Sequence, residues 1–228
     1  MTRILSISDI ELGLIYSPQI SKRFAGVDLV ISCGDLPYYY LEYIISTLNV
    51  PLYFVRGNHA CKIEYGIEGN RTAPWGGVDL HQQCKIDSSG LILCGIEGSV
   101  RYNNGPYQYT QSQMWTQVAR LMPKLLVNKL VYGRYVDIFV THAPPWKIND
   151  QEDLPHQGIK AFRWFINAFK PAFHLHGHIH LYRQALAEET LYQSCRVINT
   201  FGFRELDVNV QELASRLSVR RLGDWKGG

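Results

Sequence analysis

Residues 173–180, Phe-His-Leu-His-Gly-His-Ile-His, constrain the fold of this chain more than any other stretch. Their apolar lead-in stops at Gly177, as a buried strand that ends in a tight loop does. His178 and His180 follow with one residue between them, so a short loop can direct both imidazoles at one point. Imidazole is the commonest side-chain metal ligand, and the pair therefore indicates a metal site. Alone this is weak evidence, because the two earlier histidines fit equally well as strand residues without a ligand role.

Three apolar runs near the start of the chain end in the same way, each in a turn that carries polar side chains. They cover residues 4–8, 28–32 and 51–55. Helical segments, about 18–24 and 39–48, separate them, which predicts a βαβαβ unit with a parallel sheet. Ligands bind at the carboxyl ends of the strands in such sheets. We therefore expect the polar residues that follow these runs to lie close together.

The rest of the chain predicts more strands and three further helices. Short strands or a hairpin at 78–80, 85–87 and 91–95 extend the fold into a second sheet, followed by a helix opened by a capping box of Thr110 and Gln113. Pro123 kinks or restarts this helix. The remaining elements are expected as a strand at 136–141, a helix at 158–169, antiparallel strands of the second sheet at 181–187, 191–198 and 203–208, and an amphipathic helix from 209.

Composition fits one α/β domain over residues 1–228, with residues 209–228 as a C-terminal helix and tail. The chain is 46% hydrophobic and 19% charged, and its net charge of +3 is too small by itself to indicate a nucleic-acid or membrane partner. No apolar run is long enough to span a bilayer, and the first residues lack the apolar core of a signal peptide. Five scattered cysteines favour reduced thiols, and hence the cytoplasm, over a disulfide framework. Oligomeric state stays open.

Six residues that follow apolar runs form one set of oxygen and nitrogen donors without a thiolate. They are Asp9, Asp35, Asn58, His142, His178 and His180. This set suits Mn, Fe, Zn or Mg rather than a soft metal. Two carboxylates share a small site most easily when cations neutralise them, so a dinuclear centre with a bridging carboxylate is expected. Two such ions bind a phosphoryl group and generate hydroxide near neutral pH, which predicts phosphoester hydrolysis.

These motifs resemble the ordered signature of the calcineurin-like metallophosphoesterase superfamily. They are Asp9-x-Glu11, Gly34-Asp35, Gly57-Asn58-His59, Thr141-His142 and Gly177-His178-x-His180, within residues 3 to about 207. Five ordered motifs are far more specific than one. The resemblance implies a four-layer α/β/β/α sandwich with two divalent metal ions. It places Asp9, Asp35 and His180 on the first ion, and Asp35, Asn58, His142 and His178 on the second. It also implies that His59 contacts the phosphate and helps to protonate the leaving group.

The chain departs from the family pattern at two positions. Glu11 stands where the family usually has His, and Ala60 stands where it usually has Asp or Glu. Glu11 either ligates the first metal, which favours Mn²⁺ or Mg²⁺, or swings away and leaves that site weak; the two alternatives stay open. Ala60 removes a carboxylate that would orient or charge-pair His59, so slower turnover is expected.

A further stretch, Asp153-Leu-Pro-His156-Gln-Gly158, resembles an element of small stand-alone phosphodiesterases in the same superfamily. His156 is a candidate for contact with substrate or with a metal ligand, at equal weight with a capping role at the following helix. Arg56 is a candidate for phosphate binding through its forked donors, although a structural salt bridge is the better interpretation.

We therefore expect a metal-dependent phosphodiesterase that acts on a small or nucleotide-type substrate, with Mn favoured. The alternative is a non-catalytic, metal-binding scaffold of the same fold that binds a protein partner. Retention of His59 favours the enzyme, since such scaffolds are expected to lose this histidine or several ligands. A nuclease is a weaker interpretation because the sequence shows no strong basic stripe.

Overall fold

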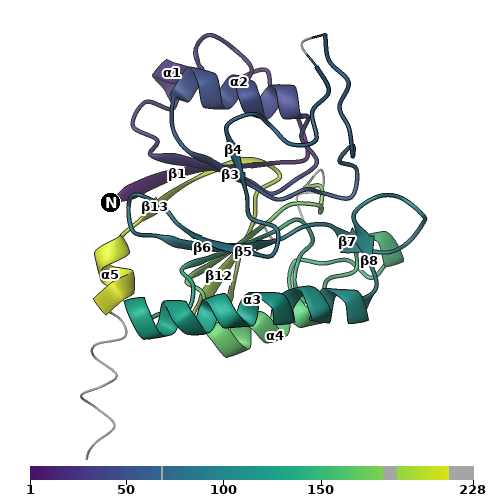
Figure 1. Cartoon of the computed structure of the whole chain (residues 1–228), viewed down its shortest axis with the longest axis vertical. Coiled ribbons are helices and arrows are strands. Elements are labelled where there is room, and N and C mark those ends of the chain that lie inside the picture. The colour runs from purple at the N-terminus through teal and green to yellow at the C-terminus, as the bar shows by residue number, and fades with distance from the viewer. Residues whose placement is uncertain (68, 182–188, 216–228) are drawn as a thin grey trace, which may run out of the picture.

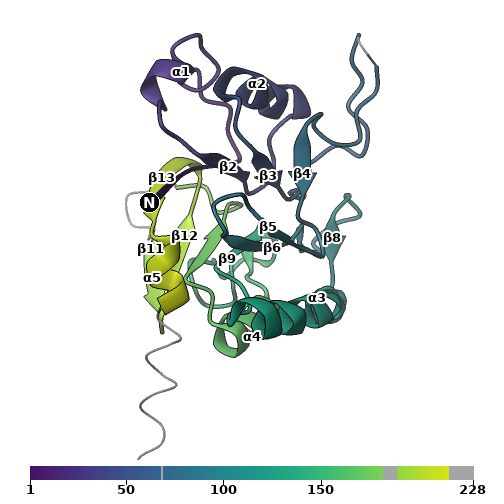
Figure 2. The same ribbon diagram turned by 60° about the vertical axis from the view of Figure 1, so that its left-hand side comes forward.

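A computed structural model shows two β-sheets packed face to face, with helices covering the outer face of each (Figure 1). The structure describes residues 1–67, 69–181 and 189–215. Figure 2, turned by 60°, shows the same layers: α1 and α2 lie beyond one sheet, and α3 and α4 lie beyond the other. The four-layer α/β/β/α sandwich predicted from the sequence is confirmed.

The first sheet is largely parallel and contains the start of the chain. In spatial order its strands are β13 (Gly202–Val208), β1 (Thr2–Ser8), β2 (Leu29–Ser32), β3 (Leu52–Phe54) and β4 (Gly77–Asp79). Only β13 runs antiparallel to its neighbour. Every residue of the central strands β2 and β3 is buried, because the sheet is covered on both faces.

The second sheet is mixed, and its central strands β10, β9 and β6 are parallel. In spatial order its strands are β11 (Glu189–Tyr192), β12 (Cys195–Asn199), β10 (Phe173–His176), β9 (Ile138–Thr141), β6 (Ile92–Ile96) and β5 (Gln83–Ile86). A small separate pair joins β7 (Ser99–Val100) to β8 (Gln108–Tyr109). Both large sheets therefore present the carboxyl ends of parallel strands along one edge of the sandwich.

Helices complete the layers on the two outer faces. They are α1 (Ile20–Arg23) and α2 (Tyr38–Leu48) on the first sheet, α3 (Gln111–Tyr132) and α4 (Lys160–Phe169) on the second, the 3₁₀ helix η1 (Leu154–His156), and α5 (Val210–Ser215). The predicted capping box is present: Thr110 accepts from the Gln113 amide at 3.2 Å, and the Gln113 side chain accepts from the Thr110 amide at 2.8 Å. None of the helices in the described ranges is long and apolar enough to cross a membrane.

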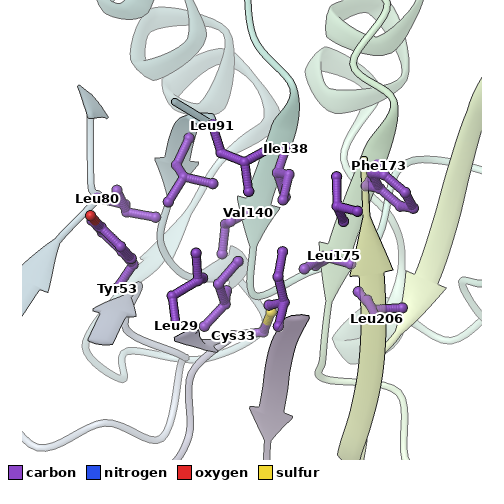
Figure 3. Close-up of a cluster of buried hydrophobic side chains, with 14 of the residues drawn as sticks. Leu29, Cys33, Tyr53, Leu80, Leu91, Ile138, Val140, Phe173, Leu175 and Leu206 are labelled. Carbon is purple, nitrogen blue, oxygen red and sulfur yellow. The ribbon is translucent and has the colours of Figure 1, made fainter. Parts of the chain in front are cut away.

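Three of the four apolar clusters among the described residues join the layers. The central cluster fills the space between the sheets, and Figure 3 shows Leu29 and Leu206 from the first sheet facing Val140 and Leu175 from the second. A second cluster packs α3 and α4 against the second sheet, and a third packs α1 and α2 against the first. The central cluster matters most for the site, because it determines how closely the loops of the two sheets approach.

Several expectations from the sequence prove wrong in detail. The predicted strand 203–208 belongs to the first sheet rather than the second, because β13 pairs with β1. The predicted strand 191–198 is two strands, β11 and β12, joined by a turn in which Gln193 has a φ of 55°. Pro123 lies inside α3, which runs on as one helix through it. The predicted strand 181–187 falls almost wholly outside the described residues, as does the end of the predicted C-terminal helix.

The prediction of reduced thiols is wrong for one pair of cysteines. Cys84 and Cys94 are directly opposite each other on the antiparallel strands β5 and β6, and they form a disulfide. Their Cα atoms are 4.3 Å apart, which spacing along the chain does not reveal before the strand register is known. Cys33 and Cys195 are buried free thiols, as expected for small apolar residues, and Cys61 is an exposed one.

Leu175 tests the central core, because it is fully buried on β10 between the sheets. We expect Leu175→Ala to lower the free energy of unfolding by about 2–5 kcal/mol, since it leaves a cavity in close-packed surroundings. Urea denaturation followed by circular dichroism measures this change. Leu191→Ala is the matched control on exposed β11, with a change within about 0.5 kcal/mol. Equal effects of the two variants would contradict this description of the core.

Candidate metal centre

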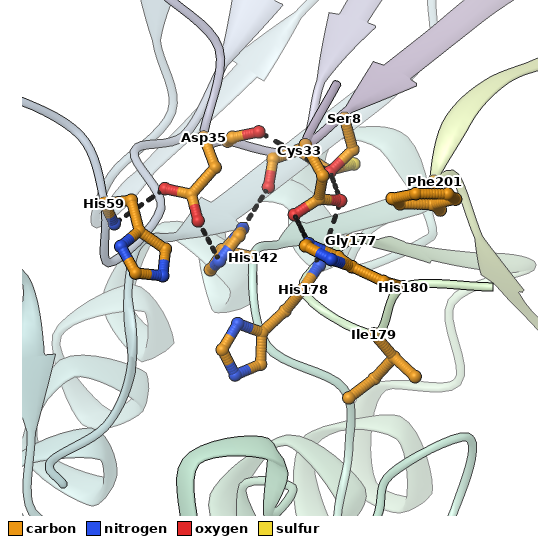
Figure 4. Close-up of polar contacts among 12 residues, drawn as sticks. Ser8, Cys33, Asp35, His59, His142, Gly177, His178, Ile179, His180 and Phe201 are labelled. Carbon is orange, nitrogen blue, oxygen red and sulfur yellow. Dashed lines mark hydrogen bonds and ion pairs between the residues drawn. The ribbon is translucent and has the colours of Figure 1, made fainter. Parts of the chain in front are cut away.

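The carboxyl ends of five strands deliver the predicted ligands to one place. Asp9 follows β1 and Asp35 follows β2 from the first sheet, whereas His142 follows β9 and His178 follows β10 from the second. Asn58 and His59 lie on the loop after β3. Figure 4 shows Asp35, His142 and His178 coming together from the two sheets. The expectation that strand ends gather the polar residues thus agrees with the geometry.

Asp35, His142 and His178 form the tightest group. Each offers one donor atom, and these three atoms lie within 4.8 Å of one another. Asp35 Oδ2 is 3.1 Å from His142 Nε2, and Asn58 Oδ1 is 2.9 Å from the same nitrogen. Four predicted ligands of the second metal are therefore together, with oxygen and nitrogen donors directed at a shared point.

Asp9 and His180 form the neighbouring half of the site. His180 Nε2 lies 3.8 Å from Asp9 Oδ1, and the His180 ring packs beside Phe201 at a centroid distance of 4.9 Å. The His178 amide donates to Asp9 Oδ1 at 3.0 Å, which ties the strand-end loop of β10 to that of β1. Asp9 also accepts a hydrogen bond from the Ser8 hydroxyl.

Backbone carbonyls fix the orientation of two histidines. His142 Nδ1 donates to the Cys33 carbonyl at 2.8 Å, which leaves Nε2 directed at Asp35 and Asn58. His178 Nε2 donates to the Pro155 carbonyl at 2.7 Å, which leaves Nδ1 as its lone-pair nitrogen. Such partners commonly orient metal-binding histidines. Sequence reasoning missed both carbonyls, since a backbone acceptor carries no residue-type signal.

Glycines allow the loops of the two sheets to meet. A Cβ at Gly34 would lie 2.6 Å from the Gly57 amide nitrogen and 2.8 Å from His142 Nδ1. A Cβ at Gly57 would overlap the Asp35 carboxylate, and one at Gly177 would overlap Ser8. No real side chain tolerates such contacts, so the glycines of the sequence motifs are required for close approach rather than for flexibility alone.

Three predicted ligands have a left-handed backbone. The φ angles are 68° at Asp9, 56° at Asp35 and 68° at His178. This conformation is uncommon for residues with a Cβ, costs roughly 1–3 kcal/mol each, and is concentrated at functional sites. It is consistent with a site selected for geometry at some cost in stability.

Burial and close charges shift the pKa values in this site strongly. Burial disfavours charge on His142, but Asp35 and Asp9 outweigh it and raise the pKa of His142 to about 9. Burial likewise opposes ionisation of Asp35, yet His142 lowers the Asp35 pKa to about 2. Burial, followed by repulsion from His142, lowers the pKa of His178 to about 3. Burial raises the pKa of Asp9, although the charges of His142 and His180 act to lower it.

Glu11 lies outside the cluster formed by the other predicted ligands. It is exposed, and its carboxylate accepts a hydrogen bond from the Tyr39 hydroxyl. This contact, together with some burial, raises the pKa of Tyr39 to about 12. The arrangement corresponds to the alternative in which Glu11 swings away from the first metal. Glu11 would need a different side-chain rotamer to bind the metal, so its role as a ligand stays a prediction.

His59 and Arg56 occupy different environments on the loop after β3. The His59 amide donates to Asp35 Oδ1 at 2.8 Å, and its exposed ring lies beside the cluster (Figure 4). Arg56 instead forms ion pairs with Asp79 at 2.6 Å and Glu97 at 3.3 Å. The guanidinium is held by these two carboxylates, which agrees with a structural salt bridge rather than with phosphate binding.

The segment around η1 reaches the site from the second sheet. Asp153 Oδ2 lies 2.6 Å from His156 Nδ1, and the His156 ring is 5.3 Å from the His178 ring. The Pro155 carbonyl of this segment accepts a hydrogen bond from His178, so the segment directly orients a predicted ligand. Tyr102 does the same on the opposite side, because its hydroxyl accepts from Asn58 Nδ2 at 3.1 Å.

Comparison with known proteins identifies the family to which this site belongs. A family model of calcineurin-like phosphoesterases matches residues 2–182. The chain belongs to this family. The match spans every motif from Asp9 to His180, and members of the family are metal-dependent and typically use two divalent ions. No curated protein shows a significant sequence match.

Solved structures share the fold of this calcineurin-like phosphoesterase at low sequence identity. TT1561 of Thermus thermophilus is 13% identical, with a TM-score of 0.60, and the match covers 91% of this chain and 99% of that one. Another crystal structure is 14% identical, with a TM-score of 0.62 and coverage of 90% and 94%. Similarity at this identity shows the fold alone.

The residues present fit a divalent cation. The donors are carboxylate, amide and imidazole groups, as Mn, Fe, Zn or Mg sites use. Asp35, His142 and His178, with Asn58 beside them, are positioned to hold one ion, and Asp9 lies 3.8 Å from His180 in the neighbouring part of the site.

Metal affinity is expected to depend on pH through His142. In the metal-free protein its pKa is about 9, so the proton must leave before Nε2 can bind an ion. Asp35 and His178, with pKa values of about 2 and 3, contribute no proton near neutrality. Affinity for Mn²⁺ should rise up to about tenfold per pH unit between about pH 6 and pH 8.

Isothermal titration calorimetry in buffers of different ionisation enthalpy measures this proton release. The expected result is a net release of protons on binding at pH 7, with an affinity that falls as the pH is lowered. An affinity that is constant over this pH range, with no proton release, would show that His142 is neutral in the metal-free protein.

Proposed function

We propose that this calcineurin-like phosphoesterase is a phosphodiesterase that hydrolyses a small or nucleotide-type phosphodiester with two bound metal ions. The observation that supports this most directly is that two groups of donors lie next to each other where the two sheets end. Asp35, Asn58, His142 and His178 form one group and Asp9 with His180 forms the other, and the His178 amide donates to Asp9 Oδ1 at 3.0 Å. A dinuclear centre requires two such adjacent groups, and Asp35 is the proposed bridging carboxylate.

The metals supply charge neutralisation and a hydroxide nucleophile when they are bound. The protein supplies the geometry. The two sheets hold the donors rigidly at strand ends, and the carbonyls of Cys33 and Pro155 keep His142 and His178 in the tautomers needed for binding. The Asp35 carboxylate accepts a hydrogen bond from the His59 amide. The loop that carries His59, the proposed general acid, is therefore bonded directly to Asp35, the proposed bridging carboxylate.

His59 is the proposed general acid. Its ring is exposed beside Asp35, where a phosphoryl group bound at the cluster would come within reach, and an imidazole can donate a proton to the leaving oxygen. Ala60 follows it and provides no carboxylate to orient the ring. We therefore propose a slower leaving-group step than in family members with an acidic residue there. A small substrate is favoured by the η1 segment, which covers His178.

Mn²⁺ is the proposed ion. A cytoplasmic location stays a prediction, and the Cys84–Cys94 disulfide removes the support that reduced thiols gave it. The oxygen-rich donors on the Asp9 side suit a hard ion, and Glu11 would add a further carboxylate if it left Tyr39. The alternative function is a metal-binding scaffold for a protein partner. The contact between Glu11 and Tyr39 is the specific observation that favours it, because it leaves the Asp9 side with fewer ligands.

The proposed activity is tested by hydrolysis of bis(p-nitrophenyl) phosphate. Metal-stripped protein should be inactive and should gain turnover with Mn²⁺. His178→Asn should abolish it through loss of a ligand, and His59→Asn should lower kcat by roughly 10²–10⁴-fold while Mn²⁺ still binds. Arg56→Lys keeps the charge of a residue engaged in ion pairs and serves as the control that retains turnover. A folded, Mn²⁺-loaded protein without turnover would support the scaffold instead.

Substitution at position 11 tests the role of Glu11. We expect Glu11→His to raise the affinity for Zn²⁺ relative to Mn²⁺, because an imidazole replaces a harder oxygen donor. Competitive titration with both ions measures the preference. Tyr39→Phe is the companion variant, since it removes the hydroxyl that holds Glu11 and should strengthen Mn²⁺ binding. Unchanged affinities in both variants would rule out Glu11 as a ligand.

A further inference from the structure

Helix α3 has an apolar face that points away from the protein. Its inner face packs against the second sheet through residues such as Leu121 and Leu125. The outer face is also apolar: Trp115, Met122, Leu126 and Leu130 follow one another at intervals of seven, four and four residues, which keeps them on one side of a helix. Leu126 is 52% exposed and Leu130 is 85% exposed. We call the exposed set Trp115, Met122, Leu126, Val127, Leu130 and Val131 the α3 outer face.

The charged side chains of α3 and α4 are all positive. Neither α3 nor α4 contains an aspartate or a glutamate. On a 3.6-residue helix, Lys124 and Lys129 fall on opposite sides of the apolar stripe. Lys124 donates to the Gln83 side chain and Lys129 to the Gly133 carbonyl at 2.7 Å, so both bond to neutral groups. The small net charge of the whole chain conceals this local concentration.

Tryptophans and further cations continue the face at the start of α3. Trp115 packs against Trp164 of α4 at a centroid distance of 5.4 Å. Lys160 lies 4.0 Å above the ring of Trp146. Together with Lys147, Arg163 and Asn167 these side chains line a shallow depression of about 450 Å³. The combination of indole rings and cations beside an apolar stripe is typical of helices that lie in the headgroup region of a membrane.

The shape and the charge of this surface decide among its possible occupants. α3 and α4 form the outermost layer on this side of the molecule, and α3 has 22 residues, about 33 Å of straight ridge (Figures 1 and 2). A helical peptide from a partner docks in a groove, which a ridge does not provide. A second copy of the chain would bring the same cations against this face. An anionic lipid surface complements both the ridge and the charge.

We propose that the α3 outer face docks on an anionic lipid surface. The leucines and valines enter the boundary between headgroups and acyl chains, the tryptophans lie at headgroup level, and Lys124 and Lys129 reach lipid phosphates on either side. Such a contact needs no membrane-spanning helix. It is independent of the metal centre, whose donors lie at the strand ends of the sandwich rather than on the α3 and α4 layer.

Cosedimentation of the purified protein with lipid vesicles tests the proposal. Wild-type protein should bind phosphatidylcholine vesicles that contain phosphatidylserine, bind pure phosphatidylcholine vesicles weakly, and lose affinity as salt is raised. The double variant Leu126→Glu/Leu130→Glu should bind at least about tenfold more weakly, because it loses apolar contact and adds negative charge. Leu191→Glu is the matched control: Leu191 is 70% exposed on β11, and its replacement should leave vesicle binding unchanged.

Three results would overturn the proposal. They are the absence of binding to anionic vesicles, equal binding by the double variant, and a wild-type dimer in sedimentation equilibrium that the double variant converts to monomers. The last would assign the face to a second copy. Thermal unfolding by circular dichroism shows whether the variants fold. If the double variant does not, Leu130→Glu and Lys124→Glu provide milder tests of the apolar and charged parts, with the same expected loss of binding.

Discussion

The contact between Asp35 and His142 joins the two halves of this protein. Asp35 comes from the first sheet and His142 from the second, and the two side chains meet at 3.1 Å where both sheets end. Burial alone would keep both groups neutral, yet each stabilises the charge of the other. Asp35 and His142 would hold a divalent cation here, whose charge would take the place of the proton that they share. The metal centre therefore depends on the packing between the sheets, with glycines at the points of closest approach.

Much of the site follows from rules that connect sequence to topology. An apolar run followed by a turn predicts a buried parallel strand, and parallel strands place the residues after them at one edge of a sheet. That reasoning brings Asp9, Asp35, Asn58, His142 and His178 together without knowledge of the contacts, and the structure places them so. The family resemblance adds the sandwich, which a single sheet edge does not imply.

Other features depend on contacts that residue patterns do not encode. The alternation of apolar and polar residues identifies β13 as a strand but does not indicate which strand it pairs with. The prediction that it belongs to the second sheet is wrong, because β13 pairs with β1 of the first sheet. The Cys84–Cys94 pair depends on strand register. The partner of Glu11 is Tyr39 from a helix 28 positions away. The Pro155 carbonyl on His178 has no signature, because every residue carries a backbone carbonyl. The apolar residues of the α3 outer face recur at helical spacing in the sequence. Only the burial of the side chains in the structure distinguishes this exposed face from the inner face of the same helix.

The most direct test of the central claim is anomalous X-ray diffraction from crystals of the protein grown with Mn²⁺. The account predicts two manganese peaks roughly 3.5–4 Å apart, with the Asp35 carboxylate between them and with His142 and His178 on one ion. Asp9 and His180 should contact the other. A single peak, or manganese bound elsewhere with Asp35 still paired to His142, would contradict a dinuclear centre at the junction of the two sheets.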